Sequence, residues 1–81
     1  MANNNTVVVI EDTVAKNYTA PMTFANDAAA QRYFQNAANK QENIGDFKMW
    51  KVAEYDYEQG IIIPVSQELL AKGDDYVKKN A

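Results

Sequence analysis

The sequence predicts an α+β fold: a small antiparallel β-sheet in the order β-β-α-β-β, with one main helix packed on a face and a short C-terminal helix. Two runs of β-branched residues, Val7–Ile10 and Ile61–Ile63, favour strands because such side chains suit the pleat. Between them lies one segment with helical spacing. The 81 residues suffice for one domain, expected over 7–73, between a disordered start (1–6) and a charged flexible tail (74–81).

Two strands are expected before the helix. The first is Val7–Ile10, where four apolar residues stand in succession. Tyr18–Phe24 is the second, and Pro21 inside it has no N–H to donate to a ladder. The second strand is therefore expected at an edge of the sheet, or bulged.

The clearest helix is expected from Ala28 to about Lys40. Asn26 is a good N-cap, and Asp27 in the first turn suits the positive end of the helix dipole. Small and aromatic residues at helical spacing form a stripe that faces the core. The stripe consists of Ala30, Phe34, Ala37 and Ala38.

Phe47–Tyr55 is the third strand, and neither of its faces is purely polar. Strict alternation assigns its side chains to two faces. One face receives Phe47, Met49, Lys51, Ala53 and Tyr55, and the other Lys48, Trp50, Val52 and Glu54.

The last elements are expected after a hairpin loop at Asp56–Gly60. Ile61–Ile63 forms the fourth strand, and Pro64 ends its ladder. Ser66 is a candidate N-cap for a short helix over Gln67–Lys72, which a glycine ends.

Composition excludes several classes of protein. Hydrophobic residues make up 47% and charged residues 23%, as in a folded domain, and no apolar run is long enough to span a membrane. No basic flank marks a signal peptide at the start, so an intracellular location is expected. The chain has neither Cys nor His, which argues against an enzyme, a cofactor and a transition-metal site. The formal net charge of −3 means that any nucleic-acid contact must use a local basic patch.

A homo-oligomer, most simply a dimer, is expected. Val7–Ile10 and Ile61–Ile63 are apolar at successive positions, so both faces of these strands require cover. One main helix covers only one face, and a chain of this size builds a small core. A symmetric partner would supply the missing cover.

The order of short motifs resembles the small nonstructural protein of gokushovirus-like microviruses, which are phages with single-stranded DNA. The similarity covers roughly Val7 to Val65. The matching residues are Asp12, Tyr18, Pro21, Asn26, Asp27, Ala30, Arg32, Phe34, Asp46, Phe47, Met49, Trp50, Glu54, Tyr55, Asp56, Gly60 and Ile61. The resemblance implies a role in the phage replication cycle in the host cytoplasm, as a DNA-binding protein or a factor that controls single-stranded DNA synthesis. It supplies no catalytic residues.

Trp50, between Lys48 and Lys51, is the main candidate for binding single-stranded nucleic acid. Such sites combine aromatic platforms with cations. The competing interpretation places Trp50 in the core or at a subunit interface. Tyr18 is a weaker candidate for stacking. Arg32 could contact phosphate, although pairing with an acidic neighbour such as Asp27 or Glu54 is favoured.

Two further patterns have simpler explanations. Glu54, Asp56 and Glu58 alternate and could hold Mg²⁺ on one face, but a solvated turn is the favoured interpretation. Ser66 is the only serine and lacks a histidine base, so a helix cap is the favoured role.

Two functions remain open at this point. The first is a non-enzymatic phage accessory protein that binds single-stranded DNA as a homo-oligomer. The second is a protein–protein adaptor that acts on phage or host replication or packaging proteins without touching DNA. No membrane contact is expected in either case.

Overall fold

The computed structural model describes residues 4–41 and 43–76. The strands and helix are β1 (Asn4–Asp12), β2 (Asn17–Tyr18), β3 (Met22–Phe24), α1 (Asp27–Ala38), β4 (Phe47–Asp56) and β5 (Ile61–Lys72), with 3₁₀ turns η1 (Ile44–Asp46) and η2 (Gly73–Tyr76). The first strand begins at Asn4, three residues before the expected start. Residues 74–76 of the expected tail belong to η2, and residues 1–3 and 77–81 lie outside the described part.

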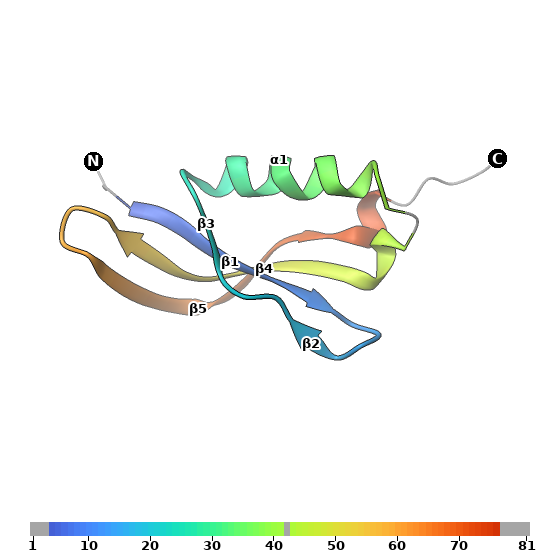
Figure 1. The fold of residues 1–81 in the computed structure, drawn as a ribbon, viewed down its shortest axis with the longest axis horizontal. Coiled ribbons are helices and arrows are strands. Elements are labelled where there is room, and N and C mark those ends of the chain that lie inside the picture. Colours follow the sequence, from blue (N-terminus) through green and yellow to red (C-terminus); the bar gives the residue numbers. More distant parts are fainter. Residues whose placement is uncertain (1–3, 42, 77–81) are drawn as a thin grey trace.

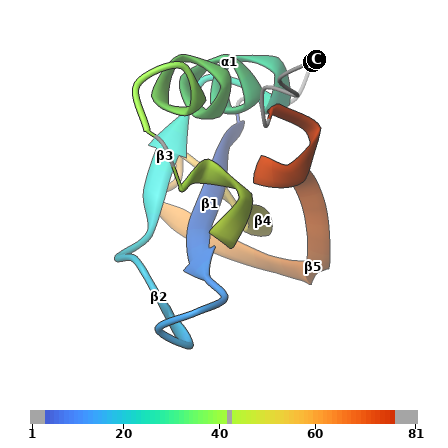
Figure 2. The same ribbon diagram turned by 90° about the vertical axis from the view of Figure 1, so that its right-hand side faces the viewer.

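The strands form one antiparallel sheet in the order β2-β1-β4-β5, and β3 also pairs with β1. Helix α1 lies across one face of the sheet, and no described helix lies on the other face (Figures 1 and 2). We call these the helix face and the open face. The α+β prediction is therefore confirmed.

The helix and its core stripe follow the sequence closely. The Asn26 side chain accepts a hydrogen bond of 2.8 Å from the Ala29 N–H, as an N-cap should. Ala30, Phe34 and Ala38 are buried against the sheet. The Phe34 ring is 1% exposed and lies 5.7 Å from the Tyr76 ring, so η2 closes the core beside α1.

Pro21 divides the expected second strand. β2 and β3 lie on either side of it, and both pair with the same edge of β1. The expectation of an edge position is confirmed, and the missing N–H of proline explains the break.

The predicted C-terminal helix is wrong. β5 continues as a strand from Ile61 through Pro64 to Lys72, so Ser66 caps no helix. Pro64 stays in register opposite Ala53, which an edge strand tolerates. Glu68, Leu69, Ala71 and Lys72 pair with β4, and this pairing outweighs the modest helical propensity of the segment.

Gly73 begins a 3₁₀ turn instead of ending a helix. A Cβ at Gly73 would overlap the carbonyl oxygen of Ile44. The absent side chain therefore lets η2 lie directly against η1, at the end of the molecule where the sheet meets the end of α1 (Figure 2).

A bulge in β4 overturns part of the predicted alternation. Val7 lies opposite Ala53 and Val8 opposite Lys51, so Val52 is an extra residue on β4. Met49 and Lys51 share the helix face as expected, but beyond the bulge Glu54 takes that face. Ala53 and Tyr55, predicted on the same face as Met49, move to the open face, since cross-strand partners lie on one side of a sheet.

Candidate nucleic-acid interface

The open face brings together three of the residues singled out in the sequence. In one row across the strands, Tyr18 lies opposite Glu11, and Glu11 lies opposite Lys48. Lys72 of β5 continues this row beside Lys48. In the next row on the same face, Trp50 lies between Val9 and Leu69.

The Trp50 side chain is fixed by a polar contact. Its Nε1–H donates a hydrogen bond of 2.9 Å to Oε1 of Glu11. The residue is only half-buried, and Leu69 beside it on β5 is 42% exposed. The indole is thus held in place with part of its surface accessible, as a stacking platform requires.

Two lysines flank this platform. Lys48 is half-buried and Lys72 is exposed, and the two face each other across β4 and β5. Neither forms an ion pair with a described residue. No carboxylate of the described residues therefore neutralises their ammonium groups.

Lys51 does not join this surface. It is only 9% exposed, and its ammonium nitrogen lies 3.3 Å from Oδ1 of Asp27 and 3.1 Å from Oε2 of Glu54. Both carboxylates are on the helix side of the sheet, where Asp27 begins α1. A nucleic-acid role for Lys51 on the Trp50 surface is therefore not supported by this geometry, because Lys51 serves to join α1 to β4.

Hydrogen bonds extend this ion-pair cluster to β1. The Thr6 hydroxyl donates a hydrogen bond of 2.7 Å to Oδ1 of Asp27, and the Asn4 amide donates one of 2.8 Å to Oε1 of Glu54. The Thr6 bond, with Lys51, lowers the pKa of Asp27 although burial opposes the shift. The Asn4 and Lys51 bonds likewise lower the pKa of Glu54.

The pKa of Lys51 is raised by the balance of two opposed effects. Burial alone would lower it, because a desolvated ammonium loses its hydration. The hydrogen bonds and negative charges of Glu54 and Asp27 together outweigh that loss. Lys51 therefore stays charged inside the cluster.

Comparison with protein families agrees with the resemblance to phage proteins seen in the sequence. The model of the family described as "Phage ORF5 protein" matches residues 5–76, which span all the described strands but the first residue of β1. The chain belongs to this family. It is therefore a bacteriophage protein. Neither the curated proteins nor the solved structures contain a match.

Arg32 of this phage protein lies apart from the open face. It is exposed on α1, and within residues 4–41 and 43–76 it makes no ion pair. The expected pairing with Asp27 or Glu54 is not observed among the described residues, where both carboxylates pair with Lys51.

The other candidate positions have structural roles. Asp56 Oδ1 accepts hydrogen bonds from the backbone N–H groups of Glu58 and Gln59, which shapes the β4–β5 turn. Glu54 belongs to the Lys51 cluster. The described residues contain no group of three His, Cys, Asp or Glu side chains that could hold a metal ion.

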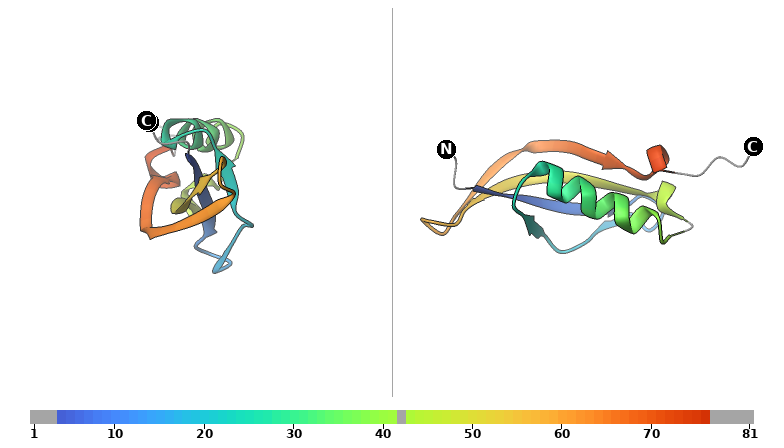
Figure 3. Two further views of the ribbon diagram at one scale, coloured as in Figure 1. Left: turned by 90° about the vertical axis from the view of Figure 1, so that its left-hand side faces the viewer. Right: turned by 90° about the horizontal axis from the view of Figure 1, so that it is seen from above.

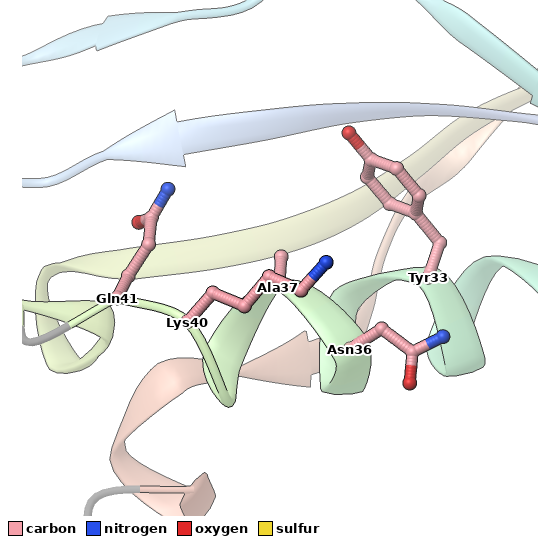
Figure 4. A pocket seen from close by; sticks show the side chains of 5 residues that line it. All are labelled: Tyr33, Asn36, Ala37, Lys40 and Gln41. Atoms are coloured by element: carbon pink, nitrogen blue, oxygen red, sulfur yellow. The ribbon is translucent and has the colours of Figure 1, made fainter.

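A shallow hollow runs along the side of α1. It has a volume of about 400 Å³ and is lined by Tyr33, Asn36, Ala37, Lys40 and Gln41 (Figure 4). The Tyr33 ring leans toward the sheet and lies 5.2 Å from the Phe24 ring. Its polar groups are the Lys40 ammonium, the Tyr33 hydroxyl and the side-chain amides of Asn36 and Gln41.

None of the helices in the described part of the chain has the length and apolar character of a membrane span. The candidate nucleic-acid interface is the open face of the sheet. Sequence analysis missed Glu11, Lys72 and Leu69 as parts of it, because only the strand register places them beside Lys48 and Trp50.

Proposed function

We propose that this phage protein is a non-enzymatic accessory protein of the single-stranded DNA replication cycle, of the kind found in gokushovirus-like microviruses, and that it binds single-stranded DNA on the open face. The observation that carries the proposal is the grouping of Tyr18, Trp50, Lys48 and Lys72 on the sheet face opposite α1. Single-stranded DNA fits such a surface because its bases can stack on aromatic rings while its phosphates meet the ammonium groups.

The acidic balance of the chain favours a modest affinity. A net charge of −3 repels a polyanion at long range, so contacts must be made locally. Glu11 adds a negative charge beside Trp50. The complex is accordingly expected to be strongest at low salt and to weaken as salt increases.

The decisive experiment measures single-stranded DNA binding at several salt concentrations. The readout is the fluorescence anisotropy of a labelled oligonucleotide. Trp50→Ala should weaken binding roughly ten-fold, since stacking contributes ~1–3 kcal/mol per base. Lys48→Ala should remove one phosphate contact. The slope of log affinity against log salt concentration should then become shallower by about one. Lys40→Ala, which removes an exposed lysine on the helix side, is the matched control and should change neither quantity.

The adaptor function is the second candidate, and the β4–β5 hairpin is the observation that favours it. The hairpin projects beyond the start of α1 (Figure 1) and exposes Tyr57, Ile61 and Ile62. Exposed apolar patches of this kind mark protein contacts. If wild-type protein gives no anisotropy change with oligonucleotide at low salt, the DNA proposal fails and the adaptor function is preferred.

A further inference from the structure

β5 leaves one long edge of the sheet open. It is 12 residues long, and it is the terminal strand of the sheet order, so its outer edge pairs with no described strand. Seen from above, β5 runs along the outside of the sheet (Figure 3). The opposite edge is shorter and is interrupted at Pro21 between β2 and β3. An open edge of this length is a ready template for another strand.

The free part of this edge extends from Ile61 to Leu69. Beyond it, the Gln31 side chain of α1 donates a hydrogen bond of 3.0 Å to the carbonyl of Leu70, so the helix covers the end of β5. The free part carries only one charged residue, Glu68. Natural edges are usually protected by lysines, prolines or bulges, and here the protection is limited to Pro64 and the irregular pairing that follows it.

The exposed apolar side chains of this edge lie at its two ends. Ile61, Ile62 and Ile63 are 48%, 63% and 42% exposed, and Leu69 is 42% exposed. Ile62 lies opposite Tyr55 and Leu69 opposite Trp50, so both project from the open face. One face of one strand thus has an apolar group near each end.

We infer that β5 associates antiparallel with β5 of a second copy of this chain, so that Ile62 of each copy meets Leu69 of the other. A two-fold axis forms the same contact twice, because Ile62 of each copy meets Leu69 of the other. The edge is therefore complementary to itself. The free stretch carries little charge, so two acidic chains can approach there without strong repulsion. Pro64 lacks an N–H, and the side chains therefore contribute much of the contact.

This arrangement leaves the proposed DNA surface accessible. Antiparallel strands related by a two-fold axis perpendicular to the sheet keep equivalent faces on the same side. Both Trp50 side chains would then project from one extended surface. The association itself requires no DNA, so it stands or falls independently of the proposed function.

The mass of the protein without nucleic acid gives the first test. Light scattering of the full chain at about 50 µM should report twice the monomer mass of 9.1 kDa. Ile62→Lys should yield the monomer, because a charge is placed in the contact. Val14→Lys is the matched control: Val14 is β-branched and 70% exposed, lies in the turn after β1 and should leave the dimer intact. A wild-type monomer, or a dimer unaffected by Ile62→Lys, would overturn the inference.

Cysteine cross-linking tests the antiparallel order without placing a charge in the contact. The natural chain has no cysteine. A mixture of Ile62→Cys and Leu69→Cys chains should form a mixed disulfide on mild oxidation, since bridged Cα atoms lie ~4.4–6.8 Å apart. Each variant alone should stay uncross-linked, because seven residues of strand separate the two positions by roughly 24 Å. Self-cross-linking of Ile62→Cys, or no mixed product, would contradict the proposed pairing.

Discussion

The ammonium of Lys51 lies 3.3 Å from the carboxylate of Asp27, so a central strand and the first turn of the helix are held together by an ion pair. The Lys51 side chain is 11% exposed, whereas the Asp27 side chain is 45% exposed. The pair therefore spans the boundary between the interior and solvent. This position sets how much free energy the pair can contribute.

Replacing Lys51 by Met should lower the free energy of unfolding by about 1–2 kcal/mol at pH 7. Breaking a fully buried pair costs ~3–5 kcal/mol, and the partial exposure of both carboxylates reduces that cost. Urea unfolding, monitored by circular dichroism, gives the free energy of unfolding of each variant. Lys48→Met, at an open-face lysine without an ion pair among the described residues, is the control and should change stability by less than ~0.5 kcal/mol. Equal losses in the two variants would contradict a special role for Lys51.

The same cluster predicts a loss of stability in acid. The pKa values of Asp27 and Glu54 are lowered in the folded protein, mainly by hydrogen bonds from Thr6 and Asn4 respectively. A depressed folded pKa stabilises the protein above the unfolded pKa, and this contribution is lost as the pH falls through the folded value. Stability should therefore decrease from about pH 5 downward.

Urea midpoints measured between pH 7 and pH 3 test this dependence. The double variant Asp27→Asn, Glu54→Gln should be less stable at pH 7 and should lose less on acidification. Glu58→Gln, in the exposed β4–β5 turn, serves as the control and should follow the wild-type curve. At alkaline pH the dependence has the opposite sign. Because the pKa of Lys51 is raised in the folded protein, its charge stabilises the fold at pH values below the unfolded pKa. This stabilisation is lost as the pH rises through the folded pKa, above about pH 10.

Phe34→Ala should cost ~3–5 kcal/mol, a large part of the stability of so small a domain. The ring is 1% exposed and packs among the buried residues of both α1 and the sheet. Its removal loses the transfer free energy and leaves a cavity. Arg32→Ala, an exposed change on the same helix, should leave the thermal midpoint nearly unchanged. If the two variants have the same thermal midpoint, Phe34 does not lie in the core.

The helix and its stripe were predictable because their determinants are local. Asn26 and the spacing of Ala30 and Phe34 act within a few residues of one another. The segment Gln67–Lys72 shows the opposite case. It has helix-forming residues, but the ladder with β4 holds it as a strand, and that partner is distant in sequence.

The candidate site was predictable only as far as alternation holds. Lys48 and Trp50 share the open face as expected, since no bulge separates them on β4. The extra residue Val52 then changes the side on which later residues lie. No local signal identifies that bulge, and the burial of Lys51 between Asp27 and Glu54 depends on a contact with α1 that spacing along one strand cannot reveal.

Glu11→Gln should strengthen single-stranded DNA binding at low salt. Glu11 accepts the indole hydrogen bond of Trp50 at 2.9 Å, and an amide oxygen can accept the same bond. The substitution therefore keeps the ring in place while removing a negative charge from the surface that meets phosphates. One unit charge at ~4 Å is worth ~1 kcal/mol in water, so about a five-fold gain in affinity is expected.

The titration uses labelled oligonucleotide at two salt concentrations, with Glu58→Gln as a control for net charge alone. Glu58 lies in the β4–β5 turn, away from Trp50, and its replacement should alter affinity much less. The gain for Glu11→Gln should shrink at the higher salt, because screening weakens the repulsion that the change removes. Equal affinities for the two charge variants would mean that only the overall charge matters and that DNA does not approach Glu11.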